Sequence, residues 1–160
     1  MTEALLLRHA KAAEKKPGQT DFERPLTAEG ERQADRMGRL LAHTDLYPDL
    51  IVSSPAARAL QTAQRAAEGL GIKPNAIVQD PRIYEAGPLV LLEILSHAVA
   101  KAKRPMLVGH NPGFEDLARQ LGRLGEDWEF PKGAVARFKA PDKEALRRGS
   151  GCQFIELLEP

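Results

Sequence analysis

Short apolar runs alternate with longer helical stretches along most of this chain, and this alternation restricts the fold more than any other feature. We expect strands near residues 4–7, 50–52, 75–78 and 105–110, and helices near residues 26–43, 55–70, 87–100 and 113–122. Strands that alternate with helices form βαβ units around a mostly parallel sheet. Two later strand-like runs, residues 134–138 and 152–158, have only a polar connection between them, so we expect an antiparallel finish to the sheet. The pattern predicts an α/β fold, a three-layer sandwich with helices on both faces of a central sheet.

Two of the expected helices carry start signals. Thr27 stands where an N-cap belongs, and Glu29 in the first turn suits the positive end of the helix dipole. Ser54 and Pro55 have the residue types preferred at the N-cap and first position of the second helix. Arg58 then falls in the first turn of that helix.

Composition narrows the class of protein. The 160 residues, 42% of them hydrophobic, suit one domain over residues 1–160 without a sizeable cap insertion. A net charge of +1 does not favour nucleic acid or an anionic membrane surface as a partner. The single cysteine, Cys152, indicates a reducing compartment, and no apolar run reaches transmembrane or signal-peptide length. We expect a complete, cytoplasmic protein, and the sequence leaves its oligomeric state open.

Unusual polar residues stand at the ends of three expected strands. Arg8 and His9 follow "LLL", "SSPAAR" follows the second strand with Arg58, and "GHNPG" follows the fourth strand with His110. Ligands of open α/β sheets bind beyond the carboxyl ends of the strands, where these residues converge. Two guanidinium groups, two imidazoles and a helix N-terminus suit a dianionic, tetrahedral group. The sequence therefore predicts a phosphoryl-binding pocket.

The segments "LLLRHAKA", "RPLTAEGERQA", "VSSPAARALQTA" and "LVGHNPG", in this order, carry a family resemblance. The chain resembles the histidine phosphatase superfamily, also called phosphoglycerate mutase-like, and within it the small SixA-type phosphohistidine phosphatases. The resemblance spans roughly residues 4 to 120. It implies that His9 is the phosphate-accepting nucleophile and that Arg8, Arg58 and His110 bind the phosphoryl group. Ala10 departs from the glycine that is usual in the superfamily, but "RHA" is frequent in SixA-like sequences.

The chemistry requires these residue types. A histidine attacks phosphorus through one neutral ring nitrogen, so the other nitrogen of His9 must hold its proton, usually by donating it to a carbonyl. Guanidinium groups such as those of Arg8 and Arg58 match the equatorial phosphoryl oxygens and stay charged at any working pH. His110, if protonated, adds a third donor.

Glu85 in "RIYEAGP" is the candidate proton donor to the leaving group. The resemblance implies that an acidic residue in this region acts as general acid and later activates water. The alternative is an ordinary loop carboxylate. Phosphohistidine also needs less help than a phosphoester, because an already protonated imidazole leaves as a neutral group.

Other basic residues near these motifs have two interpretations each. Arg24 either contacts the phosphoryl group or pairs with Glu23 or another acid, and we leave it outside the site. Lys15 and Lys16 either steer an acidic partner or only form a solvated loop. No metal is expected, since no ligand-like spacing accompanies the histidines and the nearby arginines oppose a cation. No other cofactor is expected.

Three functions remain in view: a phosphatase, a phosphomutase and a non-catalytic phosphate-binding protein. The complete set of pocket residues disfavours the third, and the 27 positions from Arg58 to Glu85 (85 − 58) leave little room for the insertions of a mutase. We expect a phosphatase that acts through a phosphohistidine intermediate. A protein phosphohistidine is the favoured substrate, and a small phosphomonoester is the alternative.

Overall fold

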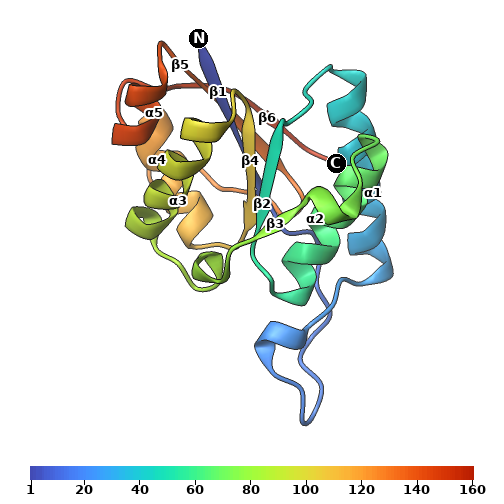
Figure 1. The fold of residues 1–160 in the computed structure, drawn as a ribbon. Helices are drawn as coiled ribbons and strands as arrows, with labels where there is room; N and C mark the ends of the chain where they lie inside the picture. Colours follow the sequence, from blue (N-terminus) through green and yellow to red (C-terminus); the bar gives the residue numbers. More distant parts are fainter.

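The strands form one six-stranded sheet between two layers of helices, as Figure 1 shows for the computed structural model of residues 1–160. The strands are β1 (Thr2–Arg8), β2 (Leu50–Ser53), β3 (Val78–Gln79), β4 (Pro105–Gly109), β5 (Val135–Ala140) and β6 (Gln153–Leu158). The helices are α1 (Ala28–His43), α2 (Ala57–Gly69), α3 (Pro88–Lys101), α4 (Gly113–Gly122) and α5 (Lys143–Arg148). Three short 3-10 helices occupy Asp21–Glu23, Pro74–Ala76 and Pro81–Ile83.

The sheet has the strand order β3-β2-β4-β1-β5-β6. β3, β2, β4 and β1 pair in parallel, whereas β1 with β5 and β5 with β6 pair antiparallel. This mostly parallel sheet with an antiparallel finish confirms the predicted fold class. Because β1, β2 and β4 run in the same direction, their carboxyl ends lie along one edge of the sheet.

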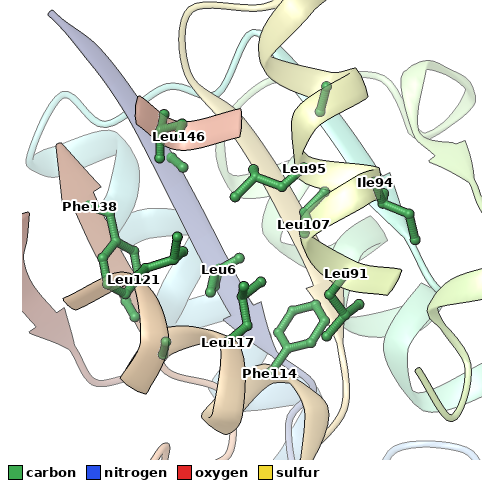
Figure 2. Packing of buried hydrophobic residues seen from close by; sticks show 14 of the residues in the cluster. Leu6, Leu91, Ile94, Leu95, Leu107, Phe114, Leu117, Leu121, Phe138 and Leu146 are labelled. Atoms are coloured by element: carbon green, nitrogen blue, oxygen red, sulfur yellow. The ribbon is translucent and has the colours of Figure 1, made fainter. Parts of the chain in front are cut away.

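Successive leucines of β1 face opposite layers, which explains why an uninterrupted apolar run begins the chain. Leu6 packs with Leu107 of β4 against α3, α4 and α5, where Figure 2 shows the side chains in contact. Leu5 and Leu7 belong to the second cluster, under α1 and α2. Both faces of the central strands are therefore buried. None of the helices has the length and apolar character that crossing a membrane requires.

The Thr27 prediction is confirmed: its side-chain oxygen accepts a hydrogen bond from the Gly30 amide at 3.0 Å. The prediction for Ser54 is wrong, because α2 begins at Ala57 with Ala56 as its N-cap and no side-chain cap. The Ser54 backbone amide instead bonds to Val108 in β4, extending the β2–β4 pairing, and its hydroxyl contacts His110 at 2.8 Å. The hydroxyl still accepts a bond from the Ala56 amide at 3.3 Å, just before the helix, so it serves a local and a tertiary partner together.

Two further expectations differ from the structure. The strand expected at residues 75–78 is mostly a 3-10 turn, closed by the Ile77 amide on the Pro74 carbonyl, and only Val78–Gln79 pairs with β2. The polar connection between β5 and β6 contains α5. The Asp142 side chain caps its start by accepting from Ala145, and Gly149 ends it at φ 67°. This is a complete set of capping signals that the sequence analysis missed.

Candidate active site

Two neighbouring parallel strands bring the site histidines together. β1 ends at Arg8 and β4 ends at Gly109, so His9 and His110 both follow the last residue of a strand. The His9 amide donates to the Gly109 carbonyl at 2.9 Å, and the two ring centroids lie 5.3 Å apart. Each histidine is 8% exposed.

The His9 ring is held by its own backbone neighbourhood. Nδ1 lies 2.7 Å from the Ala10 carbonyl oxygen, and since a carbonyl only accepts, Nδ1 carries the proton. Burial, opposed by this hydrogen bond and aided by the charges of Arg58 and Arg8, lowers the pKa of His9 to about 4. The ring is therefore neutral near pH 7 with Nε2 unprotonated, which is the form that attacks phosphorus.

His110 is neutral as well. Its Nε2 shares a hydrogen bond with the Ser54 hydroxyl at 2.8 Å, while Nδ1 is buried without a partner. Burial is the main cause that lowers the pKa of His110 to about 3. The charge that His9 gains when it is protonated and the charge of Arg58 lower it further. The protonated form of His110, which would have supplied a third charged donor, is therefore not the form present near pH 7. A neutral ring still has one N–H to donate.

The two arginines approach from different sides. Arg58, 7% exposed, donates to the Asp21 carbonyl from one terminal nitrogen (2.8 Å) and to the Asp21 carboxylate from the other (3.0 Å). Arg8 donates to the Phe130 carbonyl at 2.7 Å, and its Nε is buried without a partner. Both guanidinium charges lower the pKa of both histidines, which places all four groups in one electrostatic neighbourhood.

A cavity of about 380 Å³ opens beside these groups. Its charged and polar lining residues are Asp21, Arg58, Tyr84, Glu85, His110, Asn111 and Asp116. Arg8 and His9 are not among its lining residues. The His9 ring lies 5.3 Å from the His110 ring, which does line the cavity, and Arg8 borders a second hollow with Glu115 and Arg119. The cavity thus presents Arg58, Glu85 and His110 together.

Glu85 has an exposed side chain and a backbone φ of 60°. A non-glycine residue in this left-handed region is uncommon and often marks a functional position. The strained backbone and the cavity position are compatible with the proposed acid role.

Several residues of the site escaped the sequence analysis. Five residues contact a predicted site residue or line the cavity: Asp21, Tyr84, Asn111, Ser54 and Thr62. Thr62 carried no chemical signal, because its helical position looks like ordinary packing. Asp21 lies in the polar loop after β1, where no periodicity indicates which side chain turns inward.

The structure also shows where Arg24, Lys15 and Lys16 lie, the basic residues for which the sequence left two interpretations. Arg24 donates to the Ala13 carbonyl at 2.8 Å and to Asp21 at 2.9 Å, so it pairs with another acid rather than with Glu23. Lys15 and Lys16 are exposed. No group of three or more His, Cys, Asp or Glu side chains is arranged to hold a metal ion.

Comparison with known proteins agrees with this arrangement. Residues 4–128 match the histidine phosphatase superfamily (branch 1). A crystal structure from Agrobacterium tumefaciens, provisionally assigned as the phosphohistidine phosphatase SixA, is 34% identical with a TM-score of 0.83, covering 99% of this chain and 98% of that one. The protein histidine phosphatase SixA complexed with tungstate shares the fold at 20% identity, with a TM-score of 0.79 and coverage of 99% and 97%.

Two curated relatives have no described function. An uncharacterised protein of Picosynechococcus is 31% identical over 83% of this chain and 82% of its own length. An uncharacterised chloroplastic protein of Arabidopsis thaliana is 30% identical over 73% of this chain, and the match spans only 57% of that relative. The family match covers most of the chain and includes every motif on which the resemblance to SixA-type phosphatases depends. The chain therefore belongs to the histidine phosphatase superfamily, branch 1, as its ordered motifs predicted.

Proposed function

We propose that this protein is a phosphatase that transfers a phosphoryl group to His9 Nε2 and then to water. The observation that carries the proposal is the His9 Nδ1 hydrogen bond to the Ala10 carbonyl, which leaves Nε2 unprotonated. In the first step the N–P bond forms as the bond from phosphorus to the leaving group breaks, and the leaving group takes a proton. In the second step water attacks phosphorus as the N–P bond breaks, Glu85 takes the proton that the water loses, the His9 ring returns to its neutral form, and inorganic phosphate is released.

The arginines supply charge where the transition state needs it. Phosphoryl transfer spreads negative charge over the equatorial oxygens, and fixed guanidinium donors stabilise that charge. Arg58 is well suited, because burial holds it at the cavity and only part of its donor set is used by Asp21. His110 lines the cavity with Arg58, and Arg8 precedes His9 in the chain, so we assign both to the phosphoryl oxygens as well.

Changing His9 to Asn tests the mechanism, because nothing else in the site replaces the nucleophile. We expect turnover of nitrophenyl phosphate to be abolished with the fold retained. Brief reaction of the wild type should trap phosphate that is acid-labile and alkali-stable, as a phosphoramidate is, and the variant should trap none. A wild-type rate in His9→Asn would exclude the mechanism.

We assign Glu85 as the general acid for substrates with poor leaving groups. Its place in the lining of the cavity, beside Arg58 and His110, supports this role. Glu85→Gln should lower the rate for an alkyl phosphate by about 10²-fold or more and the rate for nitrophenyl phosphate much less, since only the alkoxide needs a proton. Equal losses for both substrates would mean that Glu85 is structural.

A protein phosphohistidine is the substrate that we favour. The segment from β3 to α3 holds only the short Pro81–Ile83 helix and a loop, so no inserted element covers the cavity from that side. An uncovered site can bind a phosphoryl group on the surface of another protein. A small metabolite would make few contacts there beyond its phosphoryl group and would gain little affinity from them. The 34% identical SixA structure agrees with this choice. We place the reaction in the cytoplasm, with neither nucleic acid nor a membrane as partner.

A substrate panel separates this choice from the alternative, a small phosphomonoester. We expect a higher kcat/KM for a phosphohistidine carrier protein than for any common metabolite. Reversing the charges of Lys15 and Lys16 should weaken only the reaction with the carrier. A metabolite turned over orders of magnitude faster than every phosphohistidine protein would favour the alternative.

A further inference from the structure

The carboxylate of Asp21 joins three parts of the protein at the edge of the cavity. It accepts hydrogen bonds from Arg58 at the start of α2 (3.0 Å), from the Tyr84 hydroxyl (2.7 Å) and from Arg24 in its own loop (2.9 Å). Its backbone carbonyl accepts a second bond from Arg58 at 2.8 Å. The nearest of these partners is three positions away in sequence and the farthest is 63.

We propose that Asp21 is a positioning residue that holds the Arg58 guanidinium in its phosphate-binding orientation. The inference rests on the proposed function, since it assigns Arg58 to the phosphoryl group. A guanidinium has five N–H donors, and Asp21 engages two of them, one on each terminal nitrogen. Three donors remain for phosphoryl oxygens. Asp21 therefore orients Arg58 without exhausting it.

Burial explains why Arg58 needs such a partner. Its side chain is only 8% exposed, and a buried charge without a counter-charge is strongly destabilising. Without the Asp21 carboxylate, the guanidinium lowers its desolvation cost by turning toward solvent and away from the histidines. Asp21 is itself 47% exposed, so it contributes little to the core, and an asparagine in its place keeps the backbone carbonyl that Arg58 also contacts.

Asp21 also fixes the wall of the cavity. The Tyr84 ring meets the His110 ring edge-on, with centroids 5.6 Å apart, and lies 6.0 Å from the Arg58 guanidinium. The bond from the Tyr84 hydroxyl to Asp21 holds this ring against both groups. One carboxylate thus positions two residues that face the phosphoryl group.

Two other roles for Asp21 predict different behaviour. As a general acid it would need a proton, but the hydrogen bonds from Tyr84, Arg24 and Arg58 hold its pKa well below the usual range, so it is ionised. As a mask it would compete with the substrate for Arg58, and its removal would strengthen anion binding. Positioning predicts the opposite change in affinity.

The test compares Asp21→Asn with the wild type by two measurements. One is the dissociation constant of inorganic phosphate, and the other is steady-state turnover of nitrophenyl phosphate. We expect phosphate binding to weaken about tenfold and kcat/KM to fall about 10- to 100-fold, with kcat contributing to the loss, because a misplaced donor weakens the transition state as well as the ground state. Tyr84→Phe, which removes one of the three donors, should show a smaller loss of the same kind. Melting temperatures of all variants separate a loss of stability from a loss of phosphate binding, and the binding measurements are made well below the lowest of them.

A matched control is Asp35→Asn. Asp35 on α1 pairs with Arg65 on α2 at 3.0 Å, the same distance, away from the cavity. Arg65 is more exposed than Arg58 and also pairs with Glu31. Phosphate affinity and turnover should be unchanged in this variant. An equal loss in Asp35→Asn would attribute the Asp21 effect to general disturbance of α2 and overturn the inference.

The remaining outcomes also decide the question. Tighter phosphate binding in Asp21→Asn would establish a mask, and unchanged affinity and turnover would exclude any role in positioning. If the wild type binds phosphate but turns over no phosphoester, the proposed function fails, while a loss of affinity in Asp21→Asn still supports the inference. A wild type that binds no phosphate overturns both.

Discussion

At the scale of single residues, the state of His9 depends on a chain of three hydrogen bonds. His9 Nδ1–H donates to the Ala10 carbonyl, the Ala10 amide donates to the Thr62 hydroxyl at 3.1 Å, and that hydroxyl donates to the Arg58 carbonyl at 2.7 Å. Thr62 is fully buried, so no water replaces it. The loop that orients the His9 ring is thereby tied to the helix that carries Arg58.

We expect Thr62→Val to destabilise the protein and slow the phosphatase reaction. Valine has the same shape but leaves the buried Ala10 amide unsatisfied, which costs about 1–3 kcal/mol. Urea unfolding measures the change in free energy, and nitrophenyl phosphate turnover measures the effect on His9. Thr62→Ser keeps the hydroxyl and should retain most activity. Full stability in Thr62→Val would show that the Ala10 amide has another partner.

At the scale of elements, the position of α2 depends on close packing against α1. A Cβ added at Gly38 would lie 2.6 Å from the Ala66 carbonyl oxygen, and one at Gly69 would lie 2.9 Å from Gly38. Backbone atoms cannot move aside as a flexible side chain does. Glycine at these places lets the helices approach, and the approach sets where the first turn of α2, with Arg58, meets the sheet edge.

Gly38→Ala should destabilise the protein by about 1–3 kcal/mol, because overpacking outweighs the gain of about 1 kcal/mol that alanine brings to a helix. Urea unfolding checks the value. Gly125→Ala is the matched control, since a Cβ there meets no atom within 4 Å, and it should be close to neutral. If the two variants changed the free energy of unfolding equally, the helices α1 and α2 could move apart to admit the new methyl group without a loss of stability.

At the scale of the whole molecule, the two buried histidines link folding to pH. Their pKa values are lowered to about 4 and about 3, whereas an unfolded histidine titrates near 6.5. Below about pH 6.5 the unfolded chain takes up protons that the folded protein does not. The free energy of unfolding therefore falls on acidification, by up to about 1.4 kcal/mol per pH unit for each histidine.

We expect urea unfolding to show a marked loss of stability between about pH 6.5 and 4. His9→Asn combined with His110→Gln should flatten the dependence in that window. Asp21 and Glu3, whose pKa values are lowered, contribute stability at higher pH that is lost only as the pH falls below about 4.5, so they do not account for it. An unchanged slope in the double variant would contradict the assignment to these histidines.

The sequence pattern was enough to predict the α/β class, the alternation of parallel strands with helices, the antiparallel finish, and the sheet edge at which Arg8, His9, Arg58 and His110 stand. The order of the strands in the sheet was not predicted. The spacing of apolar residues is a local property of the sequence, and parallel strands end at a common edge of their sheet. The predicted features therefore follow from the apolar pattern. The roles of these residues and of Glu85 remain predictions for the experiments above.

The contacts that set the chemistry of the site depend on residues far apart in the chain and became visible in the three-dimensional structure. Ser54 reads as a helix cap in sequence, yet it meets His110, 56 positions away. Asp21 reads as one of many loop carboxylates, yet it reaches Arg58, 37 positions away. The path of a loop depends on the elements that it crosses, and an irregular segment has no period from which its inward-facing side chains can be predicted. The protonation of His9 and His110 was likewise decided by burial between these elements.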